Sequence, residues 1–229
     1  NGEAAVYFSN KVKAISGGDV QLRFHEPNAL VPSLEVWDAV KNGSVDAGYT
    51  TPGYHAGKIP AVSYFTAVPF GPGASEYHGW MEYGGGQQLK DRIYGEYGLK
   101  ALNCLTHAPE TSGWFRKKIN NVEELKGMKM RFFGLGAMVM SKLGVSTQLL
   151  AGGDIYPALE KGVIDATEFS MPTHDLSYGF YQLAKFNYFP GWHQQTSIGE
   201  LLMSTKGWGG LTKTQQAVIN TACRDTMWW

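Results

Sequence analysis

The sequence contains no apolar run of the roughly 18 residues that a membrane span needs. It also has no excess of positive charge, because 20 Lys and Arg residues are balanced by 20 Asp and Glu residues. Surfaces that bind the nucleic-acid backbone are basic, so this balance argues against a nucleic-acid partner. Apolar and aromatic side chains are plentiful, at 43% and 13% of the 229 residues, and they are sufficient for a sizeable core.

Cysteine is scarce, and only Cys104 and Cys223 are present. They are compatible with one disulfide, but the sequence does not give their distance in space. We favour two small buried apolar side chains over a bridge. No CxxC pair occurs, and the histidines share no metal-ligand spacing, which argues against a zinc cluster. The histidines are His25, His55, His78, His107, His174 and His193.

The motifs of phosphate-binding loops and of common nucleophilic enzymes are also missing. Gly84-Gly85-Gly86 lacks the GK[ST] ending of a phosphate-binding loop, and GLGAMV at 134–139 lacks the third glycine of a dinucleotide fingerprint. No GxSxG elbow occurs. The sequence therefore offers no recognisable nucleophile.

One pattern occurs twice. EVWDAVKNGSVDAGYT at 35–50 is repeated as DIYPALEKGVIDATEF at 154–169, with Ala39 and Gly43 recurring 119 residues later as Ala158 and Gly162. Each copy predicts a short amphipathic helix, a glycine in the left-handed conformation and a strand. A helix–glycine–strand unit repeated at this distance predicts two similar α/β lobes.

The remaining periodicities predict further strands and helices in alternation. We expect strands at 19–25, 99–105, 128–133, 145–150 and 163–169. We expect helices at 1–16, 75–97 (interrupted by Gly84-Gly85-Gly86), 122–126, 137–143, 176–184 and 212–225. This order predicts an α/β protein with parallel sheets. The helix-like start and the abrupt end at Trp228-Trp229 predict a fragment that lacks an opening strand and a closing helix.

Three charged residues are candidates for a binding site. Arg131 lies between the apolar Met130 and Phe132 in a predicted strand, so its guanidinium must be paired. Its partner is either a ligand carboxylate or a protein carboxylate, and the sequence leaves both open. Glu168 ends a predicted strand, where open α/β sheets bind ligands, although an exposed strand-end acid is the more common case. Glu110 lies in the turn-rich HAPETSG and is by itself uninformative.

Several longer motifs carry a family resemblance. They are AVKNGSVDAGYT (39–50), FTAVPFG (65–71), EYGGGQQL (82–89), GWFRKKI (113–119), LKGMKMRFFGLGA (125–137) and GDIYPALEKGVIDATEF (153–169). In this order, the chain from Val6 to Trp228 resembles the DctP-type periplasmic solute-binding proteins of tripartite ATP-independent periplasmic (TRAP) transporters. GFYQLAKFNYFPGWHQ at 179–194 resembles the branch that binds 2-oxo or 2-hydroxy monocarboxylates with a metal ion.

The resemblance implies a two-lobe α/β fold similar to type II periplasmic binding proteins, with a cleft between the lobes. It assigns 1–105 mostly to lobe 1, 106–190 mostly to lobe 2, and 191–229 to a return segment and a truncated C-terminal helix. It further implies a periplasmic location, a small organic acid as ligand and the membrane subunits of a TRAP transporter as partners. Homodimerisation through the C-terminal helix is left open.

The resemblance also assigns roles to individual residues. Arg131 falls on the arginine that clamps the substrate carboxylate, and Tyr54 falls on a tyrosine that lines the pocket. Glu168 and the backbone carbonyl of Phe169 fall on metal ligands, and Glu110 stands where the branch commonly has a glutamine ligand. Because the negative groups outnumber Arg131, we expect Ca²⁺ in preference to Na⁺.

The function implied is capture of a small monocarboxylate such as pyruvate or lactate, without catalysis. The alternatives are a metal-dependent lyase or aldolase acting on 2-oxoacids, a receptor for a larger organic acid, and a sensor without a transporter. The enzyme would need a base at the metal, and strand alternation places Lys129 on the face opposite neither Met128 nor Met130 alone but in the same set as Arg131 only if the strand is irregular; we expect Lys129 to face away from the site.

Overall fold

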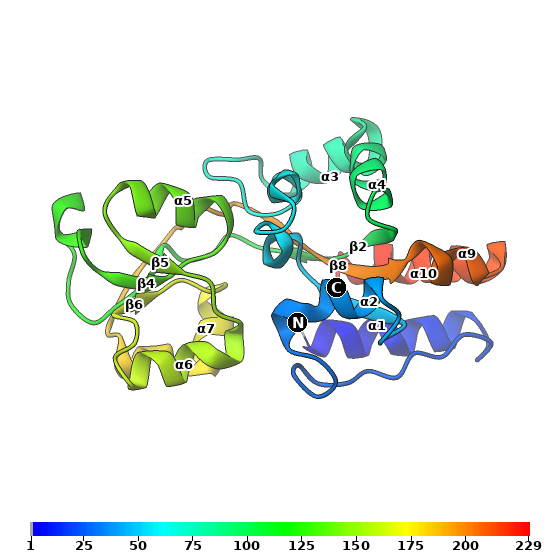
Figure 1. Ribbon diagram of the computed structural model, residues 1–229, viewed down its shortest axis with the longest axis horizontal. Helices are drawn as coiled ribbons and strands as arrows, with labels where there is room; N and C mark the ends of the chain where they lie inside the picture. Colours follow the sequence, from blue (N-terminus) through cyan, green and yellow to red (C-terminus); the bar gives the residue numbers. More distant parts are fainter. Residues whose placement is uncertain (1) are drawn as a thin grey trace. The chain divides into compact units, whose positions relative to one another are not determined.

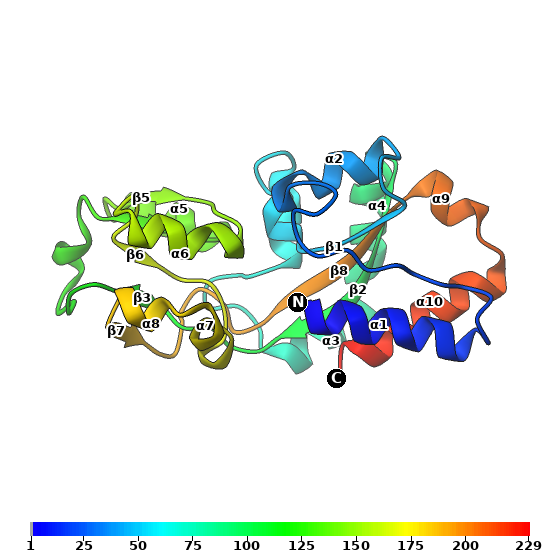
Figure 2. The same cartoon turned by 90° about the horizontal axis from the view of Figure 1, so that it is seen from below.

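The computed structural model describes residues 2–229, which form two compact units, each with its own β-sheet (Figures 1 and 2). Unit 1 comprises the chain up to Phe65, His78–Thr106 and Ile198–Trp229. Unit 2 comprises Thr66–Tyr77 and His107–Ser197. The expectation of a two-lobe α/β fold is confirmed.

Unit 1 is built on a three-stranded sheet in the order β1 (Ala47–Thr50), β8 (Ser197–Ser204) and β2 (Leu99–His107). Its α-helices are α1 (Gly2–Ile15), α2 (Val36–Lys41), α4 (Gly86–Gly95), α9 (Thr205–Gly210) and α10 (Lys213–Thr226). Its 3₁₀ helices are η1 (Ser33–Glu35), η2 (Pro52–His55) and η3 (Pro60–Phe65), and α3 (Ala74–Tyr83) spans the boundary between the units. Helices α1 and α10 lie side by side (Figures 1 and 2), and their apolar faces share a core cluster with β2 and β8.

A disulfide crosses this core. Cys104 of β2 is bonded to Cys223 of α10, with the two Cα atoms 4.2 Å apart. Both residues are buried, as expected, but the preference for unpaired cysteines is wrong. The bridge depends on how α10 packs on the sheet, and the spacing of the two residues in the sequence carries no information about that packing.

Unit 2 contains a five-stranded sheet with strands of both directions. Its order is β5 (Ser146–Gln148), β4 (Lys129–Arg131), β6 (Ala166–Thr167), β3 (Gly113–Phe115) and β7 (Phe186–Tyr188). Strand β4 runs parallel to β5 and β6, whereas β3 runs antiparallel to β6 and β7. In unit 1, β1 and β8 are also antiparallel. The expected all-parallel sheets are therefore wrong, because only β4, β5 and β6 are joined by helical crossovers.

Helices cover both faces of the unit 2 sheet. They are η4 (Val122–Leu125), α5 (Gly134–Lys142), α6 (Gly152–Glu160), α7 (Pro172–Tyr178) and α8 (Phe180–Leu183). The consecutive residues Trp114 and Phe115 of β3 enter different core clusters, since side chains alternate along a strand. Trp114 packs with residues of α6 and α8, and Phe115 packs with residues of α5.

The repeated sequence pattern has a repeated structure. The carbonyl of Ala39 at the end of α2 accepts hydrogen bonds from the fifth and sixth following N–H groups, and the carbonyl of Ala158 in α6 does the same. Gly43 and Gly162 both take positive φ angles, 79° and 69°. Strand β1 and strand β6 then begin at equivalent positions. The helix–glycine–strand prediction is confirmed in both units.

The expected strand at 19–25 is wrong. Its apolar residues are half-buried and alternate with exposed ones, and Val20 and Leu22 pack against the unit 1 core. No strand is assigned there, because alternation shows only that one side of an extended segment faces the protein. The other predicted elements occur close to their expected positions, although the helix expected at 176–184 is divided at Gly179, where φ is 76°.

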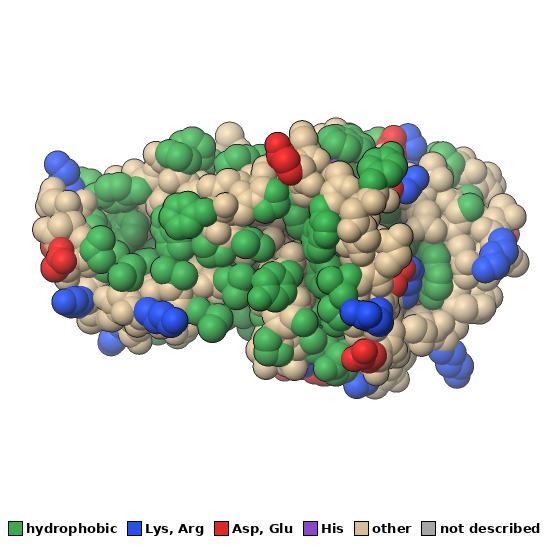
Figure 3. Space-filling model, turned by 90° about the horizontal axis from the view of Figure 1, so that it is seen from above, with side chains coloured by type: hydrophobic (Ala, Val, Ile, Leu, Met, Phe, Trp, Pro, Cys, Tyr) green, Lys and Arg blue, Asp and Glu red, His purple; other side chains and the backbone are tan. Residues whose placement is uncertain are grey.

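The surface carries few charges, in line with a charged content of 17%, and apolar side chains are frequent on the face shown in Figure 3. Within residues 2–229, no helix combines the length and the apolar character that crossing a membrane requires.

Candidate functional site

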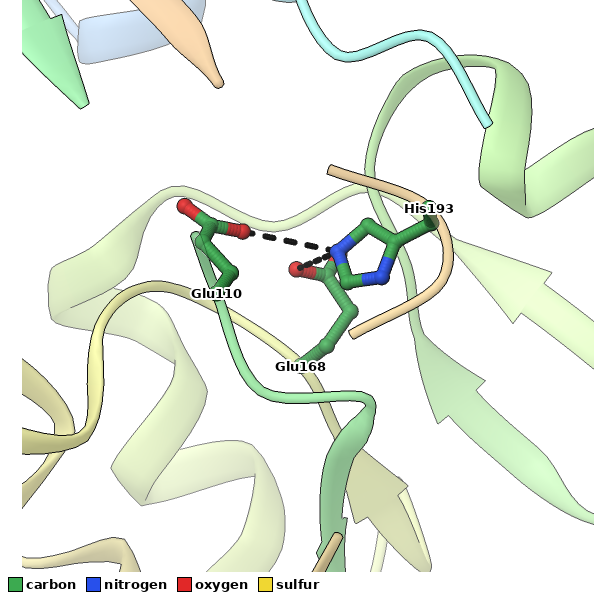
Figure 4. A group of neighbouring side chains, drawn as sticks. All are labelled: Glu110, Glu168 and His193. Carbon is green, nitrogen blue, oxygen red and sulfur yellow. Dashed lines mark ion pairs between the residues drawn. The ribbon is translucent and has the colours of Figure 1, made fainter. Parts of the chain in front are cut away.

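Three ionisable side chains from distant parts of the sequence meet inside unit 2 (Figure 4). Glu110 lies in the loop between β2 and β3, and Glu168 directly follows β6. His193 lies in the segment between β7 and β8. The side chains are almost completely withdrawn from solvent, with Glu110 4% exposed and the other two 0% exposed.

The ligand atoms of this group are close together. His193 Nε2 lies 3.4 Å from Glu110 Oε2 and 3.4 Å from Glu168 Oε2. One ligand atom from each residue lies within 4.8 Å of the others. Among the described residues, none of these three atoms has a hydrogen-bond partner. Buried polar atoms without partners are costly, so this donor set fits a bound cation.

Arg131, the last residue of β4, adjoins this group. Its Nη1 donates to Glu168 Oε1 at 2.6 Å and to the Glu168 carbonyl at 2.8 Å, and its Nε donates to the Leu150 carbonyl at 3.1 Å. No hydrogen bond from Nη2 is found within residues 2–229. The rings of Phe133 and Phe169 lie 5.8 Å and 5.2 Å from the guanidinium carbon. One side of the guanidinium is thus fixed by Glu168.

The electrostatics of the group are unequal. Burial raises the pKa of Glu110 to about 7. Burial acts in the same direction on Glu168, but the charges of Arg131 and His193 outweigh it and hold the pKa of Glu168 below its ordinary value. Burial alone would lower the pKa of His193, whereas the two carboxylates raise it to about 9. With these neighbours, His193 is protonated at neutral pH.

Close backbone contacts hold the segments in place. The Gly191 N–H donates to the Glu110 carbonyl at 2.7 Å, and the Glu110 N–H donates to the Gln194 carbonyl at 3.3 Å. A Cβ at Gly191 would lie only 2.7 Å from the Glu110 carbonyl oxygen. On α5, a Cβ at Gly136 would lie 3.0 Å from the Cβ of His193. Glycine at these positions lets the segments approach closely enough to bring His193 to the carboxylates.

The structure brings four of the five site residues expected from the sequence into this part of unit 2. Arg131, Glu110 and Glu168 are buried, so the readings of both acids as exposed are wrong. Phe169 follows Glu168 directly, and among the described residues no hydrogen bond to its carbonyl is found. Tyr54 lies in η2, which belongs to unit 1.

Lysine chemistry at the site is not supported by the placement of Lys129. Lys129 of β4 is exposed, whereas Arg131 is 1% exposed. The backbone N–H of Lys129 accepts no role in the site and instead donates to the Asp165 carboxylate at 2.9 Å.

His193 was missed from the sequence. The statement that the histidines share no ligand spacing holds along the chain, but it does not exclude a ligand that the fold brings from elsewhere. His193 lies 83 residues after Glu110 and 25 residues after Glu168. The only available signal was its position within PGWHQ, a motif that had already pointed to a metal-dependent branch.

The sequence matches the family described as "Bacterial extracellular solute-binding protein, family 7", DctP, over residues 1–228. It is 38% identical over 214 residues to a monocarboxylate 2-oxoacid-binding periplasmic protein of Nostoc sp. strain PCC 7120. That similarity covers 93% of this chain and 59% of the relative, so the chain spans somewhat over half of the relative's length.

Two solved structures are also similar. A TRAP transporter solute-binding protein from Bordetella bronchiseptica RB50, with calcium and picolinate bound, has a TM-score of 0.96 at 35% identity and covers 98% of this chain and 67% of its own. A TRAP periplasmic solute-binding protein from Pseudoalteromonas atlantica T6c, with sodium and pyruvate bound, has a TM-score of 0.94 at 33% identity and covers 98% and 68%.

Proposed function

The chain belongs to the DctP family of bacterial extracellular solute-binding proteins, and from this premise we propose that it binds a small 2-oxo or 2-hydroxy monocarboxylate through Arg131 and a divalent cation. Pyruvate and lactate are the simplest such ligands. The observation that carries the proposal is the set of unpartnered, buried ligand atoms beside the Arg131 guanidinium. Because the family consists of solute-binding proteins, the lyase or aldolase alternative is set aside.

Glu110, Glu168 and the backbone carbonyl of Phe169 would hold the cation. Carboxylate and carbonyl oxygens are the ligands that hard cations such as Ca²⁺ prefer. When bound, the cation supplies positive charge that attracts the ligand's carboxylate and its 2-oxygen together. Acids without a 2-oxygen therefore bind more weakly.

Arg131 provides the second anchor for the ligand. Its Nη1 and Nε are held by Glu168 and by the Leu150 carbonyl, which fixes the orientation of the guanidinium plane. The remaining nitrogen, Nη2, is the one that can donate to an incoming carboxylate. Glu168 therefore has two roles, since one oxygen orients Arg131 and the other faces the cation.

Charge balance favours a divalent cation over sodium. Two glutamates and the carboxylate of the ligand oppose a single guanidinium, which leaves two negative charges when His193 is neutral. A divalent ion cancels both charges, whereas Na⁺ cancels one. We therefore propose Ca²⁺ over Na⁺, although calcium and sodium are each bound in a similar structure.

Family membership supports the remaining parts of the proposal. The protein acts in the periplasm and delivers its ligand to the membrane subunits of a TRAP transporter. Tyr54 is proposed as an additional contact to the ligand, and homodimerisation stays open.

The first prediction concerns metal-dependent binding. Calorimetric titration of chelator-treated protein with pyruvate and with lactate should give saturable one-to-one binding with Ca²⁺ and much weaker binding with Na⁺ alone. Propionate, which lacks the 2-oxygen, should give little heat. Arg131→Ala should abolish binding, whereas Arg92→Ala, an exposed arginine of α4, should leave it unchanged. Equal affinity of Arg131→Ala and the parent for pyruvate would contradict the assigned site, and metal binding without any small 2-oxygenated ligand would point to a larger acid.

A further inference from the structure

We propose that His193 is a third protein ligand of the bound cation and that the site therefore prefers a transition-metal dication such as Zn²⁺ over Ca²⁺. This inference rests on the proposed metal-dependent function, and it refines which cation serves it. It follows from where the structure places His193 and from the chemistry of an imidazole nitrogen.

The positions of the ligand atoms are suitable for a single ion. His193 Nε2 is 3.4 Å from an oxygen of Glu110 and 3.4 Å from an oxygen of Glu168. Zinc lies about 2.0–2.2 Å from nitrogen and oxygen ligands, so two ligand atoms of one zinc ion are separated by at most about 4.4 Å. Both nitrogen–oxygen distances lie within this limit. In Figure 4 the carboxylates of Glu110 and Glu168 approach the same ring nitrogen.

Packing fixes the imidazole in this orientation. The Phe132 ring meets the His193 ring edge-on, with centroids 4.9 Å apart, and the Trp192 ring lies 5.8 Å away. Gly136 of α5 lies directly behind His193, where even a methyl group would be crowded. The ring is 0% exposed, so it cannot turn out into water without opening this packing. Nε2 is therefore held beside the two carboxylates.

The kind of ligand atom distinguishes the cations. Ca²⁺ takes about six to eight oxygen ligands and gains little from an imidazole nitrogen. Imidazole is a common ligand of zinc and of other late first-row metals, and their affinity for nitrogen-containing sites exceeds that of hard cations. A site with two carboxylates and one imidazole leaves positions open for the ligand's two oxygens. Such a site fits Zn²⁺ better than Ca²⁺.

A structural ion pair is the competing explanation, in which His193 only compensates the charges of Glu110 and Glu168. The two explanations differ when a cation binds. As a ligand, His193 contributes a bond whose strength depends on the metal. As a counter-charge, His193 is displaced by any cation, and its removal changes the affinity for Zn²⁺ and for Ca²⁺ in the same direction and to a similar extent.

The test compares the two affinities in the parent and in His193→Gln. Glutamine supplies an oxygen that suits Ca²⁺ but no imidazole nitrogen. Chelator-treated full chain is titrated with Zn²⁺ and with Ca²⁺ by calorimetry. The parent should bind Zn²⁺ at least about 100-fold more tightly than Ca²⁺, and His193→Gln should lower that ratio at least tenfold, a size typical of changes at metal sites. His25→Gln, at an exposed position, should leave the ratio unchanged.

A spectroscopic measurement on the parent does not depend on the folding of a variant. Pulsed electron paramagnetic resonance of the Mn²⁺-loaded parent should show coupling to an imidazole nitrogen. Glu168→Gln should remove the high-affinity ion and with it the coupling, which separates this site from adventitious surface histidines.

The outcomes separate this inference from the proposed function. If Ca²⁺ supports pyruvate binding and is bound as tightly as Zn²⁺, or if the parent shows no nitrogen coupling, the inference about His193 is overturned and the proposed function stands. If His193→Gln leaves the Zn²⁺ to Ca²⁺ ratio within about threefold of the parent, the inference is overturned in the same way. If no cation binds at all, both proposals fail.

Discussion

His55 of unit 1 and His193 of unit 2 are both 0% exposed, yet their pKa values shift in opposite directions. Burial lowers the pKa of His55 to about 4, because no carboxylate contacts its ring closely enough to offset desolvation. Both ring nitrogens of His55 lack hydrogen-bond partners among the described residues, and the ring packs against Trp37 at 4.9 Å. In His193, two carboxylates at 3.4 Å reverse the effect of burial.

This contrast predicts a pH-dependent effect of His55→Phe. The pKa of His55 is about 4 in the folded protein, below about 6.5 in the unfolded chain, so the unfolded state binds more protons between these values. The stability that neutral His55 permits is complete above pH 6.5 and is lost as the pH falls towards 4. Phenylalanine cannot be protonated, so the variant should gain about 3 kcal/mol relative to the parent between pH 7.5 and pH 4.

Urea unfolding of the two proteins across this pH range measures the difference directly. The comparison of variant with parent cancels the contributions of other titrating groups, which are common to both. The exposed His25, changed to Phe, is the control and should show no such trend. A constant difference between His55→Phe and the parent from pH 7.5 to pH 4 would contradict the prediction.

At the site, sequence alone predicted residue types better than it predicted their surroundings. Arg131 in an apolar strand had to be paired, and the structure provides Glu168 as its partner at 2.6 Å. The burial of Glu110 and the arrival of His193 depend on contacts between segments far apart in the sequence, which local patterns do not encode. The same limit applies to the disulfide, because it depends on the packing of α10 against β2.

At the scale of elements, segment 191–194 shows how a connection without regular structure can determine a binding site. It lies against the loop that carries Glu110, through the hydrogen bonds of Gly191 and Gln194. A Cβ at Gly191 would meet the carbonyl oxygen of Glu110 at 2.7 Å and the backbone of Thr111 at 3.0 Å. Backbone atoms cannot rotate away as the end of a side chain can, so the two segments would have to separate.

Gly191→Ala should therefore weaken cation binding and lower the free energy of unfolding by about 1–3 kcal/mol, as overpacking does. Gly153→Ala in α6 is the matched control, since no atom lies within 4 Å of its added Cβ and alanine favours the helix. It should leave cation affinity unchanged and stability equal or higher. Calorimetry with Ca²⁺ and thermal unfolding measure the two quantities, and an unaltered affinity in Gly191→Ala would show that the contact does not position Glu110.

Elements defined by local patterns were predicted well, and those defined by distant pairing were not. The repeated helix–glycine–strand unit is set by a few consecutive residues, and both copies form as expected. The segment 19–25 has the alternation of a strand but no strand partner, and the directions of β3 and β8 depend on how the chain passes between the units. Pairing and direction are properties of the whole chain and not of the segment.

At the scale of the whole molecule, the stabilising cross-link and the candidate site lie in different units. The disulfide joins Cys104 to Cys223 within unit 1, whereas Glu110, Glu168 and His193 all belong to unit 2. A disulfide that closes a long loop stabilises mainly by restricting the unfolded chain, typically by about 2–5 kcal/mol. It does not contribute a ligand to the cation, so its loss should affect folding and leave the cation site intact.

The variant that carries both Cys104→Ala and Cys223→Ala should accordingly melt at a lower temperature than the parent but bind Ca²⁺ with the same affinity at temperatures where both are folded. Replacing both cysteines avoids a free thiol, and alanine preserves the apolar character of the core. Glu168→Gln should show the converse, with cation binding lost while the disulfide remains formed. If the double cysteine variant lost cation affinity while still folded, the geometry of the unit 2 site would have to depend on the core of unit 1, and the separation of stability from binding inferred here would be wrong.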